Sequence, residues 1–185
     1  MILAGVTVAA FLTAVQTFLQ QRDQQSLQAV YGWLLGGFDG ADWHEVLLVA
    51  PYIAISSAVL LAHRRVLDVL SLGDDEAAAL GLDVRRVRLV IVVAATAGTA
   101  AAVSVSGLIG FVGIIVPHAV RLAVSSSYRA LLPLSLLLGA GFLVLADVIA
   151  RTILAPAEVP IGVITAFFGA PFFALVLRGA RRSAA

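Results

Sequence analysis

The chain alternates between long apolar stretches and short polar connections. A helix needs about 20 residues to cross about 30 Å of hydrocarbon, and somewhat shorter helices are tolerated inside a bundle. Six stretches meet this condition, at roughly 2–20, 46–63, 89–105, 108–124, 131–150 and 161–178. The pattern predicts an all-α integral membrane protein with six transmembrane helices, which form a single domain over residues 1–185.

Composition supports a membrane protein and excludes several other classes. Hydrophobic residues make up 61% of the chain and charged residues only 12%, whereas a soluble domain is about half apolar and about a quarter charged. The absence of Cys excludes a disulfide framework and a Cys-based metal site. Asp42, His44 and Glu45 are too close in sequence for all three to face one ion easily. We therefore expect no metal and no cofactor, and a net charge of +1 gives no reason to expect nucleic acid.

The distribution of Arg predicts the topology. When the connections are assigned alternately to the two sides of the membrane, ten Arg fall on one side and two on the other. Because cytoplasmic connections carry an excess of Lys and Arg, the Arg-rich side is predicted to be cytoplasmic. Arg22 and Arg151 are then the two external Arg.

The most highly charged segment runs from His63 to Arg88 and holds nearly half of the charges in the chain. Its centre predicts a short helix over Asp74–Leu80, because acidic residues occupy the first turn, where the helix dipole favours them. Gly81 follows at the place of a left-handed cap, and Gly73 precedes as a flexible entry. Such a helix between two spans is suited to insertion into a cleft on a partner; the alternative is a solvated loop.

A stripe of uncharged polar residues lies in the first apolar stretch. Thr13, Gln16, Thr17 and Gln20 are spaced so that they share one helix face. Polar residues within a membrane either bond to a neighbouring helix or line a wet path. The stripe is the best pathway candidate in the sequence, with helix packing as the alternative.

Charged residues recur near the external end of the fifth stretch. Asp147 and Arg151 are four residues apart, which allows a helical ion pair, and Glu158 follows in the rigid segment APAEVP. Arg151 is explained either as the neutralising partner of Asp147 or as a contact for an external protein.

Glycine and proline predict where helices stop. Gly36, Gly37 and Gly40 indicate turns in the external segment 21–45, and a tight turn is expected near Ser104–Gly107. Pro117 is expected to interrupt its helix, and the sequence Gly169-Ala170-Pro171 to break the last span.

Four motifs then appear in a recognisable order. They are SLGDDEAAALGL at 71–82, SGLIGFVGIIVPHAVRL at 106–122, ADVIAR at 146–151 and AEVPIGVITAFFGAPFF at 157–173. Together they resemble the FecCD-type permeases, the membrane subunits of binding-protein-dependent ABC importers for iron-siderophores, haem and vitamin B12. The resemblance covers almost the whole chain. Subunits of that family have ten spans, so the chain resembles their C-terminal portion, spans five to ten, and is expected to be truncated at its N-terminus.

The resemblance implies a set of partners. A second permease copy, identical or paralogous, would complete a dimer within the lipid of the bacterial cytoplasmic (inner) membrane, with the substrate path between the copies. Two cytoplasmic ATPase subunits and an extracytoplasmic substrate-binding protein would join it. The chain has no phosphate-binding loop of its own, so it is not expected to be an enzyme.

The resemblance also assigns roles to residues. Residues 71–82 would form the cytoplasmic coupling helix segment that docks on the ATPase, and Arg151 and Glu158 would meet the binding protein. The coupling residues are Gly73, Asp74, Asp75, Glu76, Ala77, Leu80 and Gly81.

The predicted function is therefore a permease subunit that moves an iron-siderophore or related metal chelate, such as haem or cobalamin. Two alternatives remain. A secondary transporter driven by an ion gradient would need an ionisable group near the middle of the membrane, and a truncated permease could be non-functional.

Overall fold

The computed structural model describes residues 2–20, 24–38, 40–155 and 157–183, and these form helices joined by short connections. In chain order the helices are α1 (Ile2–Gln20), α2 (Gln24–Leu35), α3 (Trp43–Ala62), α4 (Arg64–Leu70), α5 (Asp74–Ala79), α6 (Val84–Ser106), α7 (Val112–Ala123), α8 (Tyr128–Thr152) and α9 (Ile161–Ser183). The described residues contain no strand, which confirms the predicted all-α class.

Within the described residues, α3, α6 and α8 are each long and apolar enough to cross a membrane. α7 and the apolar part of α9, Ile161–Ala174, are shorter. At 1.5 Å per residue, α7 is only about 18 Å long. The predicted stretch 108–124 is therefore wrong at its start, because the chain reaches α7 through an irregular segment instead of a helix.

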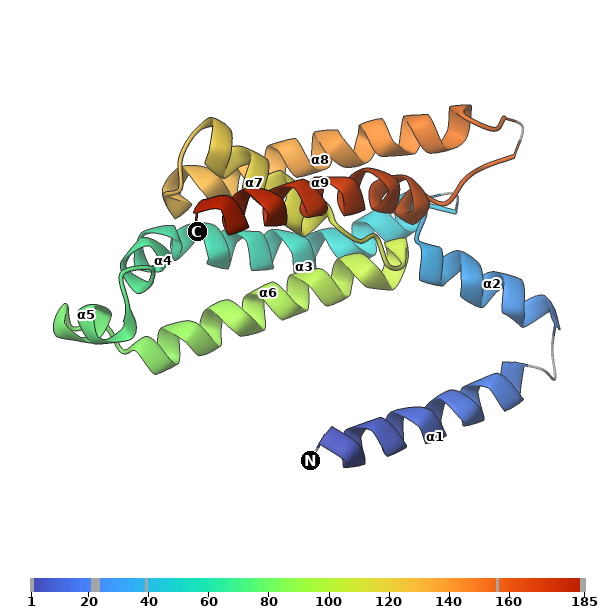
Figure 1. Cartoon of the computed structure of the whole chain (residues 1–185), viewed down its shortest axis with the longest axis horizontal. Helices are drawn as coiled ribbons and strands as arrows, with labels where there is room; N and C mark the ends of the chain where they lie inside the picture. The colour runs from blue at the N-terminus through green and yellow to red at the C-terminus, as the bar shows by residue number, and fades with distance from the viewer. Residues whose placement is uncertain (1, 21–23, 39, 156, 184–185) are drawn as a thin grey trace.

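α3 and α6 pack along each other in the bundle, and α7 packs against α8 (Figure 1). A Cβ at Gly98 of α6 would come 2.9 Å from the Cβ of Ser56 in α3, so glycine permits this close approach. A small hydrophobic core joins α8 to α9, and its buried residues are Ala146, Ala150, Ile161 and Ile164. α1 lies apart from this bundle in Figure 1.

The connections gather at the two ends of the bundle. α4, α5, the α7–α8 connection and the C-terminal end of α9 share one end, which we call the α5 end (Figure 1). The α6–α7 and α8–α9 connections and the C-terminal end of α2 share the other, which we call the Arg151 end. The Arg residues of α4, the first turn of α6 and the first turn of α8 lie at the α5 end, as the predicted topology requires.

Several predicted breaks are absent. Pro117 lies inside α7 and Pro171 inside α9, and both helices continue past them. Within a bundle, neighbouring groups and small local adjustments can satisfy the backbone groups that a proline frees. Gly169 does not break α9 either: it makes room for Phe111, whose ring occupies the place of a Cβ there.

The turn expected near Ser104–Gly107 lies later, since α6 runs through Ser106 and Gly107 ends it with a φ of 65°. A Cβ on Gly107 would strike the Trp33 carbonyl at the end of α2. The amide of Leu108 donates to that same carbonyl at 3.2 Å, and the amide of Gly37 donates to the Ser106 carbonyl at 3.0 Å. Backbone contacts of this kind join α2 to the α6–α7 connection.

Candidate functional site

α5 is the predicted short helix, and it begins at Asp74 and ends at Ala79. Its last turn is closed by two backbone hydrogen bonds, from Gly81 to the Ala78 carbonyl at 2.9 Å and from Leu82 to the Ala77 carbonyl at 3.2 Å. This pair of bonds, with Gly81 in the left-handed region at a φ of 83°, defines a Schellman cap. The predicted left-handed cap is therefore present.

The two faces of α5 differ sharply. Ala77 is fully buried, and α5 contacts α4 and α6. Leu72 and Leu80, which flank the helix, are 67% and 68% exposed. The acidic side chains of Asp75 and Glu76 are exposed between them. The result is a rigid projection that presents two leucines and carboxylates at the end of the bundle.

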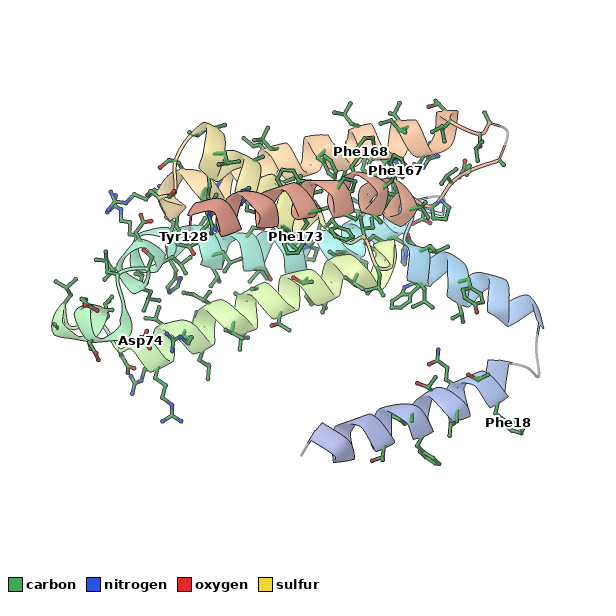
Figure 2. The ribbon with its side chains drawn as sticks, viewed as in Figure 1. Phe18, Asp74, Tyr128, Phe167, Phe168 and Phe173 are labelled. Carbon is green, nitrogen blue, oxygen red and sulfur yellow. The ribbon has the colours of Figure 1, made fainter. Side chains whose placement is uncertain are left out.

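An ion pair fixes the entry to α5. The Arg88 guanidinium of α6 donates to the Asp74 carboxylate at 2.6 Å. Figure 2 shows Asp74 beside the first turns of α6. Gly73 precedes it with a φ of 133°, and a Cβ there would meet the Glu76 carboxylate. Because the flexible Glu76 side chain can move aside, the positive φ is the reason that glycine is favoured here.

Asp68 of α4 forms a second cluster of polar contacts at the α5 end. The sequence pattern does not predict this cluster. The Asp68 carboxylate accepts hydrogen bonds from the Tyr128 amide at 2.6 Å and the Ser127 hydroxyl at 2.8 Å, and the Arg129 guanidinium lies 3.4 Å away. Partial burial acts to raise the pKa of Asp68, but these hydrogen bonds and the Arg129 charge together hold it below its ordinary value. The partners lie some 60 residues further along the chain, so no local signal indicates the contact.

Arg151 is the centre of a cluster at the opposite end. Its Nε donates to the Asp147 carboxylate at 2.9 Å, and its Nη2 donates to the Phe38 carbonyl at 3.3 Å. Nη1 lies 3.9 Å from the carboxylate of Glu158. One guanidinium therefore links α8, the α2–α3 connection and the α8–α9 connection, and its side chain remains 43% exposed.

The structure thus brings Arg151 and Glu158 together, as the sequence suggested, and it shows the predicted Asp147 pair. Pairing with Asp147 does not use the whole guanidinium, which has five donors. Whether an external protein contacts this cluster is a separate proposal.

The polar stripe of α1 is only partly within the described side chains. Thr13, Gln16 and Thr17 are exposed, and the side chain of Gln20 lies outside the described part. The Thr17 hydroxyl donates to the Thr13 carbonyl of its own helix at 2.8 Å, a bond that Thr commonly makes within helices. The stripe stays a pathway prediction.

An apolar groove of about 660 Å³ lies among α3, α6, α7 and α8. Ala94, Gly98 and Ala102 of α6 lie along it, and hydroxyl groups of Ser56 and Thr99 are among its few polar atoms. A small residue at every fourth position is the sequence signal that could have indicated this surface.

Known proteins are similar to this chain in sequence and in fold. A sequence model of the FecCD transport family matches residues 1–179. The chain is 46% identical over 178 residues to the cobalamin import system permease protein of Halobacterium salinarum, which covers 96% of this chain and 48% of that protein. It is 40% identical over 181 residues to the hemin transport system permease of Yersinia pestis, covering 96% of this chain and 54% of that protein.

A third relative is the Fe(3+)-citrate import system permease of Bacillus subtilis, 37% identical over 179 residues, with 97% of this chain and 54% of that protein covered. A solved structure of a metal-chelate type ABC transporter in an inward-facing conformation superposes with a TM-score of 0.84 at 32% identity, over 96% of this chain and 58% of that one.

The chain therefore spans about half the length of these curated relatives. The relatives are transport permeases rather than enzymes, and the helices of this chain are those of a multi-pass protein of the cytoplasmic membrane. The extent of the match and the superposition lead to one conclusion: the chain belongs to the FecCD transport family.

Proposed function

We propose that this chain is part of the permease of a binding-protein-dependent ABC importer that carries an iron-siderophore or a related metal chelate such as haem or cobalamin. The relatives support this class, since they are named as permeases for cobalamin, hemin and ferric citrate. The permease would pair with a second copy, identical or paralogous. An external binding protein would deliver the chelate.

The observation that carries the proposal is the surface of α5. Leu72 and Leu80 expose apolar side chains on either side of this capped helix, outside the membrane spans, and apolar surface of this kind is available to a partner. The Schellman cap and the ion pair between Asp74 and Arg88 hold this surface in a defined place. In our proposal two ATPase subunits bind the α5 projections of the two permease copies and supply the energy.

A secondary transporter is less well supported. Such a transporter needs an ionisable group near the middle of the membrane as a coupling site. In the described spans α3, α6 and α8, the acidic and basic residues lie in the first two turns of a helix or, for Asp147 and Arg151, in the last two turns of α8, and the weakly acidic Tyr52 lies near the middle of α3. Asp147 and Arg151 also pair with each other.

Site-directed cross-linking tests the proposed ATPase contact, and the chain has no native Cys to interfere. Ala78→Cys places a thiol on the exposed face of α5, and Ala157→Cys places one at the Arg151 end. We expect the cognate ATPase to cross-link to the first variant only. A membrane-impermeant thiol reagent applied from outside should label the second variant only. Equal cross-linking at both positions, or external labelling of Ala78→Cys, would contradict the proposal.

Uptake into proteoliposomes tests the rest. The permease that contains this chain, its cognate ATPase and its binding protein are reconstituted, and import of labelled ferric siderophore, haem and cobalamin is measured with and without ATP. Import of one chelate that requires ATP supports the proposal. Import that follows an ion gradient without ATP would indicate the secondary transporter, and no import of any chelate would indicate a non-functional chain.

A further inference from the structure

The coupling segment, residues 71–82, is attached to the bundle in two ways. Its sequence neighbours α4 and α6 join it directly, and Arg88 holds the start of α5. The other attachment is indirect: α4 is bonded through Asp68 to the N-terminus of α8, which is distant in sequence. Figure 2 shows Tyr128 at the same end of the bundle as Asp74.

The Asp68 contact has the geometry of a helix cap supplied by another segment. The first amides of a helix have no partner within the helix, and the Tyr128 amide finds one in Asp68 at 2.6 Å. Ser127, the residue that precedes α8, donates its hydroxyl to the other carboxylate oxygen at 2.8 Å. Bonds to an ionised acceptor are roughly twice as strong as neutral ones. Arg129, whose side chain is 62% exposed, adds little by comparison.

Asp68 is itself held in place. Its backbone carbonyl accepts the Ser71 hydroxyl at 2.6 Å, where α4 ends and the coupling segment begins. Its side chain is only 23% exposed, in contrast to the exposed partners of the other ion pairs at this end. The most protected carboxylate at the α5 end therefore joins the start of the coupling segment to α8.

α8 extends from this contact to the opposite end. It runs without interruption for 25 residues, about 37 Å at 1.5 Å per residue. Its last turns carry Asp147 and Arg151, the centre of the other cluster. One helix, which continues past Pro133, thus connects the two ends of the bundle.

We propose that Asp68 is a positioning residue that locks the coupling segment to α8, so that α5 and α8 move together when a partner engages either end. This inference rests on the proposed function, because the partner at the α5 end is the ATPase. Asp68 touches neither partner nor substrate in this scheme. It acts through the geometry of α4 and α8.

The first test measures the attachment itself, without transport. Spin labels are placed on Ala78→Cys of α5 and Leu137→Cys of α8, both exposed positions, and their distance distribution is recorded in lipid. Asp68→Ala should broaden or shift the distribution. Asp68→Asn should preserve it, because its amide oxygen can accept from Tyr128 and its amide nitrogen can donate to Ser127. Glu45→Ala, which removes a carboxylate near the opposite end, controls for net charge.

The second test measures energetic linkage. In the reconstituted transporter, Asp68→Ala should reduce the chelate imported per ATP hydrolysed by about fivefold or more, the lower range of coupling between sites. With the ATPase at saturating concentration, the amount bound to the permease should stay unchanged, and Asp68→Asn should restore the ratio. A residue needed only for folding would lower bound ATPase and import in parallel.

The outcomes separate the two proposals. If the unmodified chain shows no ATP-dependent import, the proposed function fails, whereas the label distances still report whether Asp68 fixes α5. If import is normal and Asp68→Ala changes neither the distance nor the ratio, the positioning role is wrong. A changed label distance with an unchanged amount of chelate imported per ATP would also overturn the positioning role, because the contact would then not affect the linkage between ATP hydrolysis and import.

Discussion

Arg88 of α6 and Asp74 of α5 form a hydrogen-bonded ion pair 2.6 Å long across the connection between the two helices. Both side chains are more than half exposed, so the pair adds little to overall stability, about 0.2–1 kcal/mol in comparable cases. The pair joins the start of α5 to α6, and we expect it to define the direction in which α5 projects.

The first prediction follows from that pair. Arg88→Ala should change the thermal stability of the purified protein only slightly but should weaken ATPase binding, because α5 is no longer held in one direction. The double exchange Asp74→Arg with Arg88→Asp should restore binding partly, since the reversed pair loses the favourable placement of an acid at the helix start. Arg86→Ala is the matched control, because Arg86 pairs with Asp83 three residues before it and not with α5. Equal loss of binding in both single variants would show that total charge matters and not the direction of α5.

The second prediction concerns Gly81. A Cβ there would meet no atom within 4 Å, but its φ of 83° is unfavourable for other residues. Gly81→Val should therefore destabilise the cap by about 1–2 kcal/mol through backbone strain alone. Cross-linking of Ala78→Cys to the ATPase should fall, and ATP hydrolysis should no longer be linked to uptake. Gly81→Asn should behave nearly as the unmodified chain, because Asn tolerates the left-handed region. Normal uptake with the Val variant would show that the coupling segment is an ordinary loop.

α5 was predictable because its signals are local. The acids of its first turn, Gly73 and Gly81 all lie within a few residues of the helix that they define. α4 is different: it has no side-chain cap, and its attachment depends on Asp68 meeting residues 59 and 60 positions away. α2, rich in Gln, was missed because it lies in a segment whose glycines and aromatic residues indicate turns and an interface instead of a helix.

The errors at proline and glycine have a common physical cause. A local rule treats Pro117 and Pro171 as helix breakers, but within a bundle the cost is offset by neighbouring groups. Gly169 likewise leaves space for the side chain of Phe111, which lies in a different segment of the chain. For the candidate sites, the pairing of Asp147 with Arg151 was predictable from their spacing, whereas the contact of Arg151 with Phe38 was not, since it spans 113 positions.

The third prediction concerns the polar stripe of α1. If Thr13, Gln16 and Thr17 line a substrate path, Gln16→Leu should slow uptake while assembly and basal ATP hydrolysis stay nearly unchanged. Gln16 is exposed in the structure. Phe11→Leu, a change at another exposed position of α1, should leave uptake unaffected. Loss of assembly in Gln16→Leu would show that the stripe packs against another helix.

The fourth prediction is the pH dependence of the Asp68 contact. Because the folded-state pKa of Asp68 lies below its ordinary value of 3.8, its contribution to stability is fully present above 3.8 and is lost as pH falls through the lowered value. The label distance between Ala78→Cys and Leu137→Cys should therefore stay constant between about pH 5 and 8. Stronger acidification should change it no more than Asp68→Asn does, because a protonated carboxyl also offers one acceptor for Tyr128 and one donor for Ser127. A distance change centred near neutral pH would show that a group other than Asp68 controls the attachment of α5.

The last prediction concerns Arg151, whose guanidinium is shared among Asp147, Phe38 and Glu158 yet remains 43% exposed. We propose that this exposed part meets an acidic residue of the external binding protein. Charges at the rim of an interface act mainly on the rate of association and on its salt dependence. Arg151→Glu should slow docking about tenfold at low salt, and reversal of the partner's acid should restore part of the rate.

Arg151→Lys provides the control, because it keeps the charge but cannot reproduce the planar fork that contacts several oxygens at once. Steering by charge should survive in this variant, while thermal stability should fall if the shared contacts matter for folding. If Arg151→Glu lowers stability but leaves the docking rate unchanged at low salt, Arg151 serves only to join α8 to its neighbours. Slower docking with little loss of stability would establish it as a contact for the binding protein, since the Asp147 pair alone does not explain such a result.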